Sequence, residues 1–458
     1  MRHPAIPKLR WIIAALLLAV TLINYIDRTA LSVLVEQIKQ SLHLTDTDYS
    51  QIVSLFLVAY AIMYAVSGWV VDNVGVKLGM ALFVFLWSLA QIFHGFAGGK
   101  WSFAACRIGL GLAEPGSFPA AVAAIGEWFP ARQRALGVGI FNVGSSLGAA
   151  VAAPLAAWIA LHYNWRAVFV FTGALGIVWI VAWLVLYESP RRNRWLSEQE
   201  AREFREAPIT AEMAAGTDPR QKGSGGQSIS SDSLEETPAA TPPPGAVMPA
   251  MAPEKASWWS VVSSRPGLMV ILPRLLTDPV IYFVIFWLPE YLEKVRGFDL
   301  AMIGKYAWMP YVIGGAPGYI IGGLLSGRMI RRGRKLGVSR KMAMTVGAAF
   351  LPAAILAPFV PSAGLAIAAM CVVVFGHAIW ISNLMALPTD LFASRSVATA
   401  AGVSGMGGAI GGALANWFTG SIVLHFSYLP IFICAGLLHP FAVLLVWLLL
   451  PERYFQKC

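Results

Sequence analysis

Apolar runs of about 20 residues recur along this chain and alternate with short polar segments. A helix needs roughly 20 apolar residues to cross a bilayer, and lipid offers the backbone no hydrogen-bond partners, which favours helices as spanning elements. We therefore predict an all-α integral membrane protein with twelve transmembrane helices. The predicted spans are residues 11–34, 50–73, 78–98, 102–126, 134–160, 166–187, 266–292, 304–328, 342–360, 363–386, 396–422 and 429–450.

The composition agrees with a membrane location. Of the 458 residues, 57% are hydrophobic and 13% are charged, whereas soluble domains average about 45–50% apolar and about 25% charged residues. The net charge of +10 is assigned to loops on one side of the membrane rather than to nucleic-acid binding. The sequence has no P-loop and its four cysteines have no CxxC spacing. We therefore expect no enzyme activity, no cofactor, no metal site and no disulfide.

A polar segment divides the chain into two halves. Residues 190–258 include a Gly-, Ser- and Pro-rich stretch that cannot build an apolar core. We predict a cytoplasmic linker here, disordered over residues 208–254, between an N-terminal bundle (residues 1–189) and a C-terminal bundle (residues 259–458). Lys and Arg collect in loops that fall on one side when twelve spans are threaded in order, so both termini are predicted to be cytoplasmic.

Two glycine patterns occur in both halves, six spans apart. The first is Gly68-x3-Asp72-x2-Gly75-x-Lys77 after span two, echoed by Gly323-x3-Gly327 after span eight. The second, Gly-x3-Gly, occurs in spans five and eleven. The repetition predicts two pseudo-symmetric six-helix bundles around a central cavity. We interpret Gly68, Asp72, Gly75 and Lys77 as a gating motif at the end of a helix.

Four charged side chains lie inside predicted spans: Asp27 and Arg28 in the first, Arg107 and Glu114 in the fourth. A charge at the centre of a span costs roughly 2.5–3.5 kcal/mol on insertion scales, and such residues normally face a watery cavity or a partner. Arg107 and Glu114 share a helix face but lie roughly 10 Å apart along the axis, too far to pair. Pro115 is expected to kink this helix. We interpret the charges as a path for a charged solute; the alternative is a structural role.

Adjacent positions place Asp27 and Arg28 on different faces of one helix, about 100° apart. One arrangement points Arg28 into the cavity and turns Asp27 toward span four or five. The alternative is an intramembrane salt bridge that only holds helices together.

These motifs resemble those of the major facilitator superfamily. The segment Asn24-Tyr25-Ile26-Asp27-Arg28, with Arg107-x6-Glu114, is similar to its anion:cation symporter family, which includes bacterial hexuronate and aldonate carriers. The likeness covers nearly the whole chain except the linker. Gly327 departs from the pattern, since an Asp is usual there, and this departure concerns the second gating latch.

The resemblance implies a proton-coupled symporter that moves an organic anion, most simply a sugar acid such as a hexuronate or aldonate, by alternating access. It implies that Arg28 binds the substrate carboxylate and that Asp27 and Glu114 exchange protons. A planar guanidinium can hold a carboxylate through two hydrogen bonds, and Arg107 is predicted to contribute to the same anion site.

The remaining predicted substrate residues are polar or aromatic side chains within spans. By resemblance Tyr25 and Tyr60 line the cavity, while Ser382 and Asn383 suit hydroxyl recognition and Trp380 could stack on a sugar face. Each second-half residue could instead bridge helices. Ser145 completes the predicted site. Arg274 and Asp278 in span seven are further polar residues of the second half.

Two other functions fit the same residues. One is a sodium-coupled or potential-driven carrier of an organic anion or phosphate, and the other is a membrane sensor that does not transport. The expected partners are a small carboxylate, protons and the lipid bilayer, without nucleic acid. We expect a monomer in a cell membrane, the bacterial inner membrane.

Overall fold

The computed structural model describes residues 8–190, 193, 195–196, 257–298, 302 and 305–455. The elements assigned within these ranges are helices, which agrees with the predicted all-α class. The segment 208–254, predicted to be a disordered linker, lies outside the described residues.

All six predicted spans of the first half are confirmed as long apolar helices. Pro115 breaks the fourth as predicted, because proline lacks the amide N–H that the helix ladder needs: α5 ends at Ala113 and a short 3-10 turn leads into α6. The helices are α1 (Leu9–Val33), α2 (Val35–Leu42), α3 (Asp46–Val74), α4 (Val76–His94), α5 (Lys100–Ala113), η1 (Glu114–Gly116), α6 (Ser117–Trp128), α7 (Ala131–His162) and α8 (Trp165–Leu186).

Four predicted spans of the second half are likewise confirmed, which gives ten candidate membrane helices within the described residues. The spans are α11 (Arg265–Phe286), α17 (Ala363–Leu384) with α18 (Leu387–Leu391), α19 (Val397–His425) and α20 (Leu429–Leu449). Short elements at their ends are α10 (Trp258–Ser263), α12 (Leu288–Arg296), η3 (Ser394–Ser396) and η4 (Glu452–Tyr454).

The ranges 304–328 and 342–360 form broken helices rather than the continuous ones predicted. The first contains a π-helix, η2 (Pro310–Gly315), followed by α14 (Ala316–Arg331) of 16 residues. The second contains α15 (Leu336–Ala348) of 13 residues, followed by turns and α16 (Ala353–Leu356). Prolines at 310, 317 and 352 remove backbone donors at the interruptions. That these segments also cross the membrane stays a prediction.

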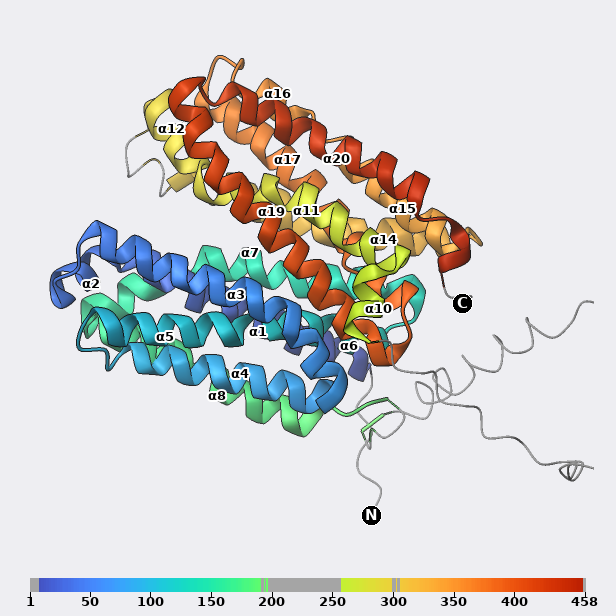
Figure 1. Ribbon diagram of the computed structural model, residues 1–458, viewed down its shortest axis with the longest axis horizontal. Helices are drawn as coiled ribbons and strands as arrows, with labels where there is room; N and C mark the ends of the chain where they lie inside the picture. The colour runs from blue at the N-terminus through green and yellow to red at the C-terminus, as the bar shows by residue number, and fades with distance from the viewer. Residues whose placement is uncertain are drawn as a thin grey trace, which may run out of the picture.

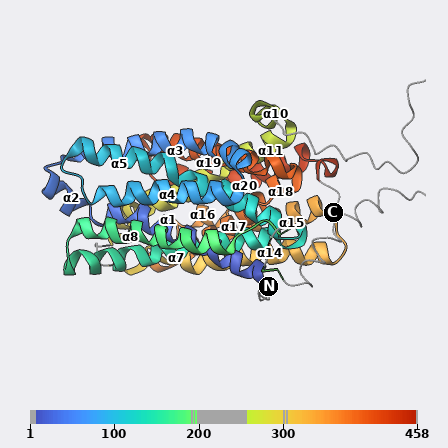
Figure 2. The same ribbon diagram turned by 90° about the horizontal axis from the view of Figure 1, so that it is seen from below.

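Two groups of helices lie side by side with their long axes roughly aligned (Figure 1). Helices α1–α8, blue to green, form one group and α10–α20, yellow to red, form the other. The start of α1 and the end of α20 lie at the same end of the molecule, opposite α2 (Figures 1 and 2). We call this the terminal end and the side of α2 the opposite end.

At the opposite end, α3 begins with a capping box. The Thr45 side chain accepts a hydrogen bond from the Asp48 amide, and the Asp48 carboxylate accepts one from the Thr45 amide. Asp48 also forms an ion pair with Lys100. The hydrogen bonds from Lys100 and Thr45 hold the pKa of the exposed Asp48 carboxyl group below its usual range.

Glycines allow the two halves to touch through their backbones at the terminal end. A Cβ atom on Gly68 of α3 would lie 2.0 Å from the Ala398 carbonyl oxygen of α19. A Cβ atom on Gly323 of α14 would lie 2.3 Å from Cα of Leu136 on α7. The two glycines that the sequence paired as repeats therefore have the same physical role in both halves.

The predicted gating motif forms one latch between the halves. The Asp72 carboxylate accepts hydrogen bonds from the backbone amides of Ala398 (3.1 Å) and Thr399 (2.7 Å), and so caps the N-terminus of α19. Gly75 adopts a φ of +90° at the junction of α3 and α4, which favours glycine. Lys77 forms an ion pair with Glu188 within the same half.

A second latch has a different construction, which accounts for Gly327. A Cβ atom there would lie 2.4 Å from the Arg132 carbonyl oxygen, so this position has no space for an Asp side chain. Buried Asp390 of α18 instead accepts from Arg134 of α7 (3.0 Å) and from Arg340 of α15 (2.8 Å). Arg340 also donates to the Ala131 carbonyl oxygen (2.7 Å) and joins the halves directly.

Replacing Gly68 with Ala should weaken closure of the terminal end, because the added Cβ clashes with the α19 backbone. The reporter is Ala401→Cys in a protein whose native cysteines have been replaced. Its reaction with a maleimide should be roughly tenfold faster with Gly68→Ala than with Gly68, because a tenfold change in the population of the open state corresponds to about 1.4 kcal/mol. Gly364→Ala is the control, since its Cβ would meet open space. Equal labelling rates in both variants would contradict this account of the contact.

Candidate functional site

The central feature of the site is an ion pair between α1 and the break after α5. Arg28 donates from Nε (3.1 Å) and Nη2 (2.7 Å) to the same oxygen, Oε2, of Glu114. Glu114 is fully buried, while 28% of the Arg28 side chain remains exposed. The other carboxyl oxygen of Glu114, Oε1, is buried without a partner. One oxygen of the Glu114 carboxylate therefore remains available for a further interaction.

Aromatic rings of α1 and α3 surround the Arg28 guanidinium. Its central carbon lies 4.7 Å from the Tyr60 ring centroid, 5.3 Å from Tyr25 and 6.0 Å from Phe56. Such rings attract a cation electrostatically and exclude water from it. The structure thus brings the predicted residues Tyr25 and Tyr60 together around the predicted anion ligand.

Arg107 lies near this pair but does not join it. Its side chain is 2% exposed, and its Nε and Nη2 atoms have no hydrogen-bond partner. Phe56 lies between the two arginines, with its centroid 5.8 Å from the guanidinium carbon of Arg107. Glu114 pairs with Arg28 rather than Arg107, in agreement with the seven-residue spacing. A buried guanidinium with unused donors is a strong attractor for an anion.

Asp27 turns away from Arg28, as the 100° step requires, and Arg107 and Glu114 of the predicted fourth span act on it electrostatically. The carboxyl group lies beside Gln91 of α4 and Thr172 of α8, the third and sixth spans, although neither residue reaches it with hydrogen-bond geometry. The sequence arrangement turned it toward span four or five. Glycines let α8 pack closely on α4 here, since a Cβ on Gly173 would lie 2.8 Å from the Ser88 carbonyl oxygen.

A second ion pair lies on the C-terminal half, within α11. Arg274 Nη2 is 2.7 Å from Asp278 Oδ2, and a Cβ atom on Gly408 would lie 2.0 Å from that oxygen. The Tyr64 hydroxyl faces Arg274, and the Tyr64 ring packs edge-on against Tyr60 at 5.4 Å. Aromatic side chains therefore connect the two ion pairs across the interface. Tyr64, which the sequence analysis did not select, follows Tyr60 by one helical turn.

The predicted hydroxyl ligands of the second half are engaged within the protein in this conformation. Fully buried Trp380 donates to Thr277 Oγ1 (3.1 Å), and Ser382 donates to the Ile379 carbonyl oxygen. Asn383 donates to the Gly322 carbonyl oxygen of α14 (3.0 Å), while its own oxygen has no partner.

Ser145 lies at the interface between the halves. It is buried on α7, donates to the Asn142 carbonyl oxygen (2.6 Å) and faces Tyr319 of α14. A small cavity of about 10 Å³ lies between α3 and the second half and is lined in part by Tyr64, Arg274 and Ser404. It is about the size of one water molecule, so the centre of the interface is closely packed.

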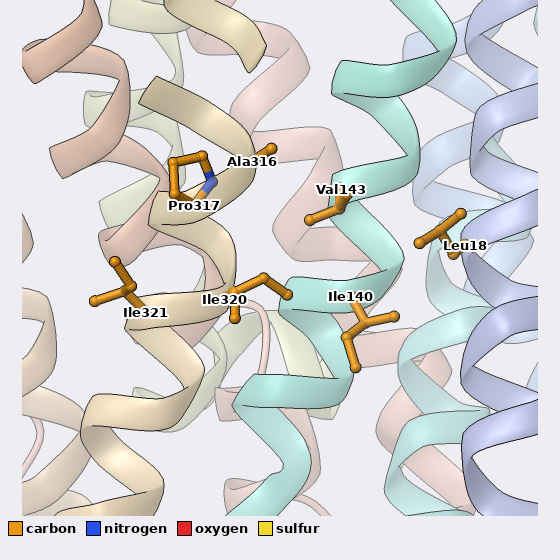
Figure 3. A pocket seen from close by; sticks show the side chains of 7 residues that line it. All are labelled: Leu18, Ile140, Val143, Ala316, Pro317, Ile320 and Ile321. Atoms are coloured by element: carbon orange, nitrogen blue, oxygen red, sulfur yellow. The ribbon is translucent and has the colours of Figure 1, made fainter. Parts of the chain in front are cut away.

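A larger groove of about 400 Å³ lies between α7 and α14, beside α1. Figure 3 shows that its walls are aliphatic side chains. A carboxylate would find no donor on these side chains, so we place the candidate site at the two ion pairs and not in this groove. The lining residues are Leu18, Ile140, Val143, Ala316, Pro317, Ile320 and Ile321.

Sequence reasoning missed the latch residues Arg134, Arg340 and Asp390. A signal was present, since Asp390 ends the tenth span as Glu127 ends the fourth, six spans earlier. The same repeat that paired Gly68 with Gly323 therefore points to Asp390.

Comparison with known proteins places this geometry in context. A family model described as Major Facilitator Superfamily matches residues 17–416. The hexuronate transporter of Escherichia coli (strain K12) is 30% identical over 449 residues, which cover 98% of this chain and 95% of that protein. The galacturonate transporter of Dickeya chrysanthemi is 32% identical over 345 residues, or 75% of this chain and 89% of that protein.

A solved structure of the proton:xylose symporter XylE, bound to 6-bromo-6-deoxy-D-glucose, has a TM-score of 0.68 with 96% of each chain covered. Its sequence identity is 15%, so this likeness concerns the fold alone. Together the comparisons confirm the superfamily and the similarity to bacterial sugar acid transporters that the motifs indicated.

Removing one partner of the Arg28–Glu114 pair should destabilise the protein more than removing both. Arg28→Met leaves a buried charge on Glu114 without its cation, at a cost of about 3 kcal/mol. The double variant Arg28→Met/Glu114→Gln removes both charges and should recover most of that loss. Thermal unfolding in detergent measures the difference; equal midpoint temperatures for the single and double variants would show that the pair carries little energy.

Proposed function

Because the chain belongs to the Major Facilitator Superfamily, we propose that it is a symporter that moves a sugar acid, a hexuronate or an aldonate, together with a proton. The chain is a transporter and not an enzyme. The similarity to transporters of hexuronate and galacturonate supports this class of substrate.

The observation that carries the proposal is the Arg28–Glu114 pair with its partly exposed arginine. A substrate carboxylate is proposed to approach the exposed side of Arg28 and compete with Glu114 for the guanidinium fork. Glu114 would then be a buried carboxylate without its cation, which is costly. Taking up a proton removes that charge. Binding of the anion thereby favours binding of a proton at the same site.

The charge balance of the first half supports the same coupling. Asp27 and Glu114 offset the charges of Arg28 and Arg107, all of them buried or partly buried. An arriving monoanion adds one negative charge to a site that is poorly screened by water. One proton, on Glu114 or on Asp27, restores neutrality before the loaded site crosses the membrane.

The substrate hydroxyl groups need partners beyond the anion site. Tyr25 and Tyr60 lie directly around Arg28, and we propose that their hydroxyl groups contact the sugar chain. Ser145, Trp380, Ser382 and Asn383 remain proposed ligands for the conformation in which the two halves hold the substrate between them.

We also propose the transmembrane arrangement that alternating access requires. The η2–α14 and α15–α16 segments would complete twelve spans in two bundles, residues 1–189 and 259–458, in a monomer in the bacterial inner membrane. With the terminal end on the cytoplasmic side, the latches at Asp72 and Asp390 close the cytoplasmic exit. The structure would then represent an outward-facing or occluded stage of transport.

The test is uptake of labelled hexuronates, aldonates and aldarates into proteoliposomes, with a pH gradient, a sodium gradient or a membrane potential alone. The proposal expects accumulation of a hexuronate or aldonate that depends on an inward proton gradient. Accumulation driven by sodium, or by the potential without proton movement, would replace proton coupling by the alternative mechanism. Binding without any uptake would favour a sensor.

Conservative arginine variants test the anion site itself. Arg28→Lys and Arg107→Lys keep the charge but lose the planar fork, so the apparent affinity for substrate should fall roughly 10- to 100-fold. Arg265→Lys, at an exposed arginine that donates to the Leu449 carbonyl oxygen, is the matched control and should transport normally. Normal affinity in both Arg28→Lys and Arg107→Lys would make these arginines structural.

A further inference from the structure

A strip of buried polar side chains runs through the interior of the N-terminal half, beside the part of α1 that carries Asp27 and, between Asp27 and Arg28 on the helical wheel, Asn24. Its members lie on three packed helices and are 0–1% exposed. Gln91 connects the three helices, because its amide nitrogen lies 3.1 Å from Thr172 Oγ1 and 3.5 Å from the Asp27 carbonyl oxygen. We call the strip the polar file; it consists of Asn24 and Asp27 on α1, Ser88, Gln91 and His94 on α4, and Thr172 on α8.

Most polar atoms of the file have no partner in the protein. They are both amide atoms of Asn24, both carboxyl oxygens of Asp27, Ser88 Oγ, Gln91 Oε1 and His94 Nε2. Native folds leave only a few buried polar groups unpaired per 100 residues. A concentration of such groups in one strip of one half therefore indicates that the strip binds something.

The chemistry of these atoms selects water as the ligand. Asn24 Nδ2 and the Ser88 hydroxyl need acceptors, whereas the Asp27 carboxylate and Gln91 Oε1 need donors. His94 Nδ1 bonds the Ala90 carbonyl oxygen at 2.7 Å, which leaves Nε2 as an acceptor. A metal cation satisfies only acceptors, while a water molecule satisfies both kinds of group.

The file has a direction. His94 ends α4 at the opposite end, next to a loop in which Gly98 is exposed. Toward the terminal end, α4 continues with buried Val84 and Met80, and α8 continues with the stacked rings of Trp179 and Trp183. Polar atoms therefore extend from Asp27 toward the opposite end as far as His94, whose ring packs against Phe103 and Phe169.

The charged groups that face Asp27 come from the neighbouring fourth span. Arg107 on α5 and Glu114 on η1 act on it electrostatically, and α8 contributes the uncharged Thr172. Arg107 also acts on His94. Arg107 would repel a metal cation that moves along the file. A proton differs from a metal cation, because the Asp27 carboxylate can bind it covalently. The neutral carboxylic acid then no longer attracts Arg107.

We propose that the polar file holds a chain of water molecules that carries the coupling proton to Asp27 from the opposite end, separately from the substrate route at Arg28. The proposal rests on the proton-coupled function proposed above. Each water molecule accepts one proton and passes one on, so the file returns to its initial composition after Asp27 changes from carboxylate to carboxylic acid. Proton and substrate thereby reach two faces of α1, about 100° apart, by different paths.

Apolar variants of similar size test the route. In Gln91→Met and Asn24→Leu, proton-gradient-driven uptake should slow by about tenfold or more. Substrate affinity, and counterflow exchange with no net proton movement, should stay near the wild-type values. Thr21→Val is the matched control on α1, since its buried hydroxyl already donates to the Leu17 carbonyl oxygen; it should be normal in all three assays.

The outcomes separate this inference from the proposed function. If wild-type uptake ignores the pH gradient, both fail. If wild-type uptake is proton-driven and both apolar variants are normal, only the file fails. Uptake that needs sodium in the wild type and loses sodium dependence in the variants would identify a cation site and overturn the water chain.

A measurement on the wild-type protein avoids dependence on folded variants. Hydroxyl radicals generated within protein-associated water by a synchrotron pulse should label His94, although its side chain has no exposed surface. His377, which is also buried but bonded to His439 at 3.0 Å in the other half, should label far less. Equal, background labelling of the two histidines would contradict a hydrated file.

Discussion

The Arg28–Glu114 ion pair is the interaction on which the site depends, because it places opposite charges where water cannot screen them fully. The pair is fixed by two features of the chain: α1 presents Arg28 toward Glu114, and Pro115 breaks the fourth span directly after Glu114. A fully buried carboxylate tolerates loss of its cation only by moving, pairing again or taking a proton. If an incoming anion displaced Glu114 from Arg28, each of these responses would couple anion binding to a further change in the protein.

Arg28 and Asp27 lie on two faces of α1 with different surroundings. Arg28 lies among aromatic rings near the interface between the halves, while Asp27 lies in the first-half interior among unpaired polar atoms. In the proposed rocking of the halves, the surroundings of Arg28 would change more than those of Asp27. The latches at Asp72 and Asp390 join the halves at the terminal end, away from Arg28, so the proposed gating would not require contact with the proposed anion site.

Sequence patterns predicted much of this arrangement because hydrophobic length, proline and spacing act locally. The ten long spans, the break at Pro115 and the failure of Arg107 to pair with Glu114 follow from such local rules. The position of Asp27 beside Gln91 and Thr172 was not predicted, because it depends on how α4 and α8 pack, which spacing within α1 does not determine. The latch at Asp390 joins residues more than 200 positions apart in sequence, beyond the reach of any local rule.

Proton uptake by the purified protein on binding substrate tests the central claim most directly. In a weakly buffered detergent solution with a pH indicator, addition of a hexuronate or aldonate that binds should withdraw protons from the medium. The wild type should take up about one proton per bound anion, as charge neutralisation at a poorly screened site requires. The double variant Asp27→Asn/Glu114→Gln, which lacks both carboxyl groups, should bind substrate with markedly less proton uptake. Binding by the wild type with no change in pH, across the range where carboxylates titrate, would contradict the account.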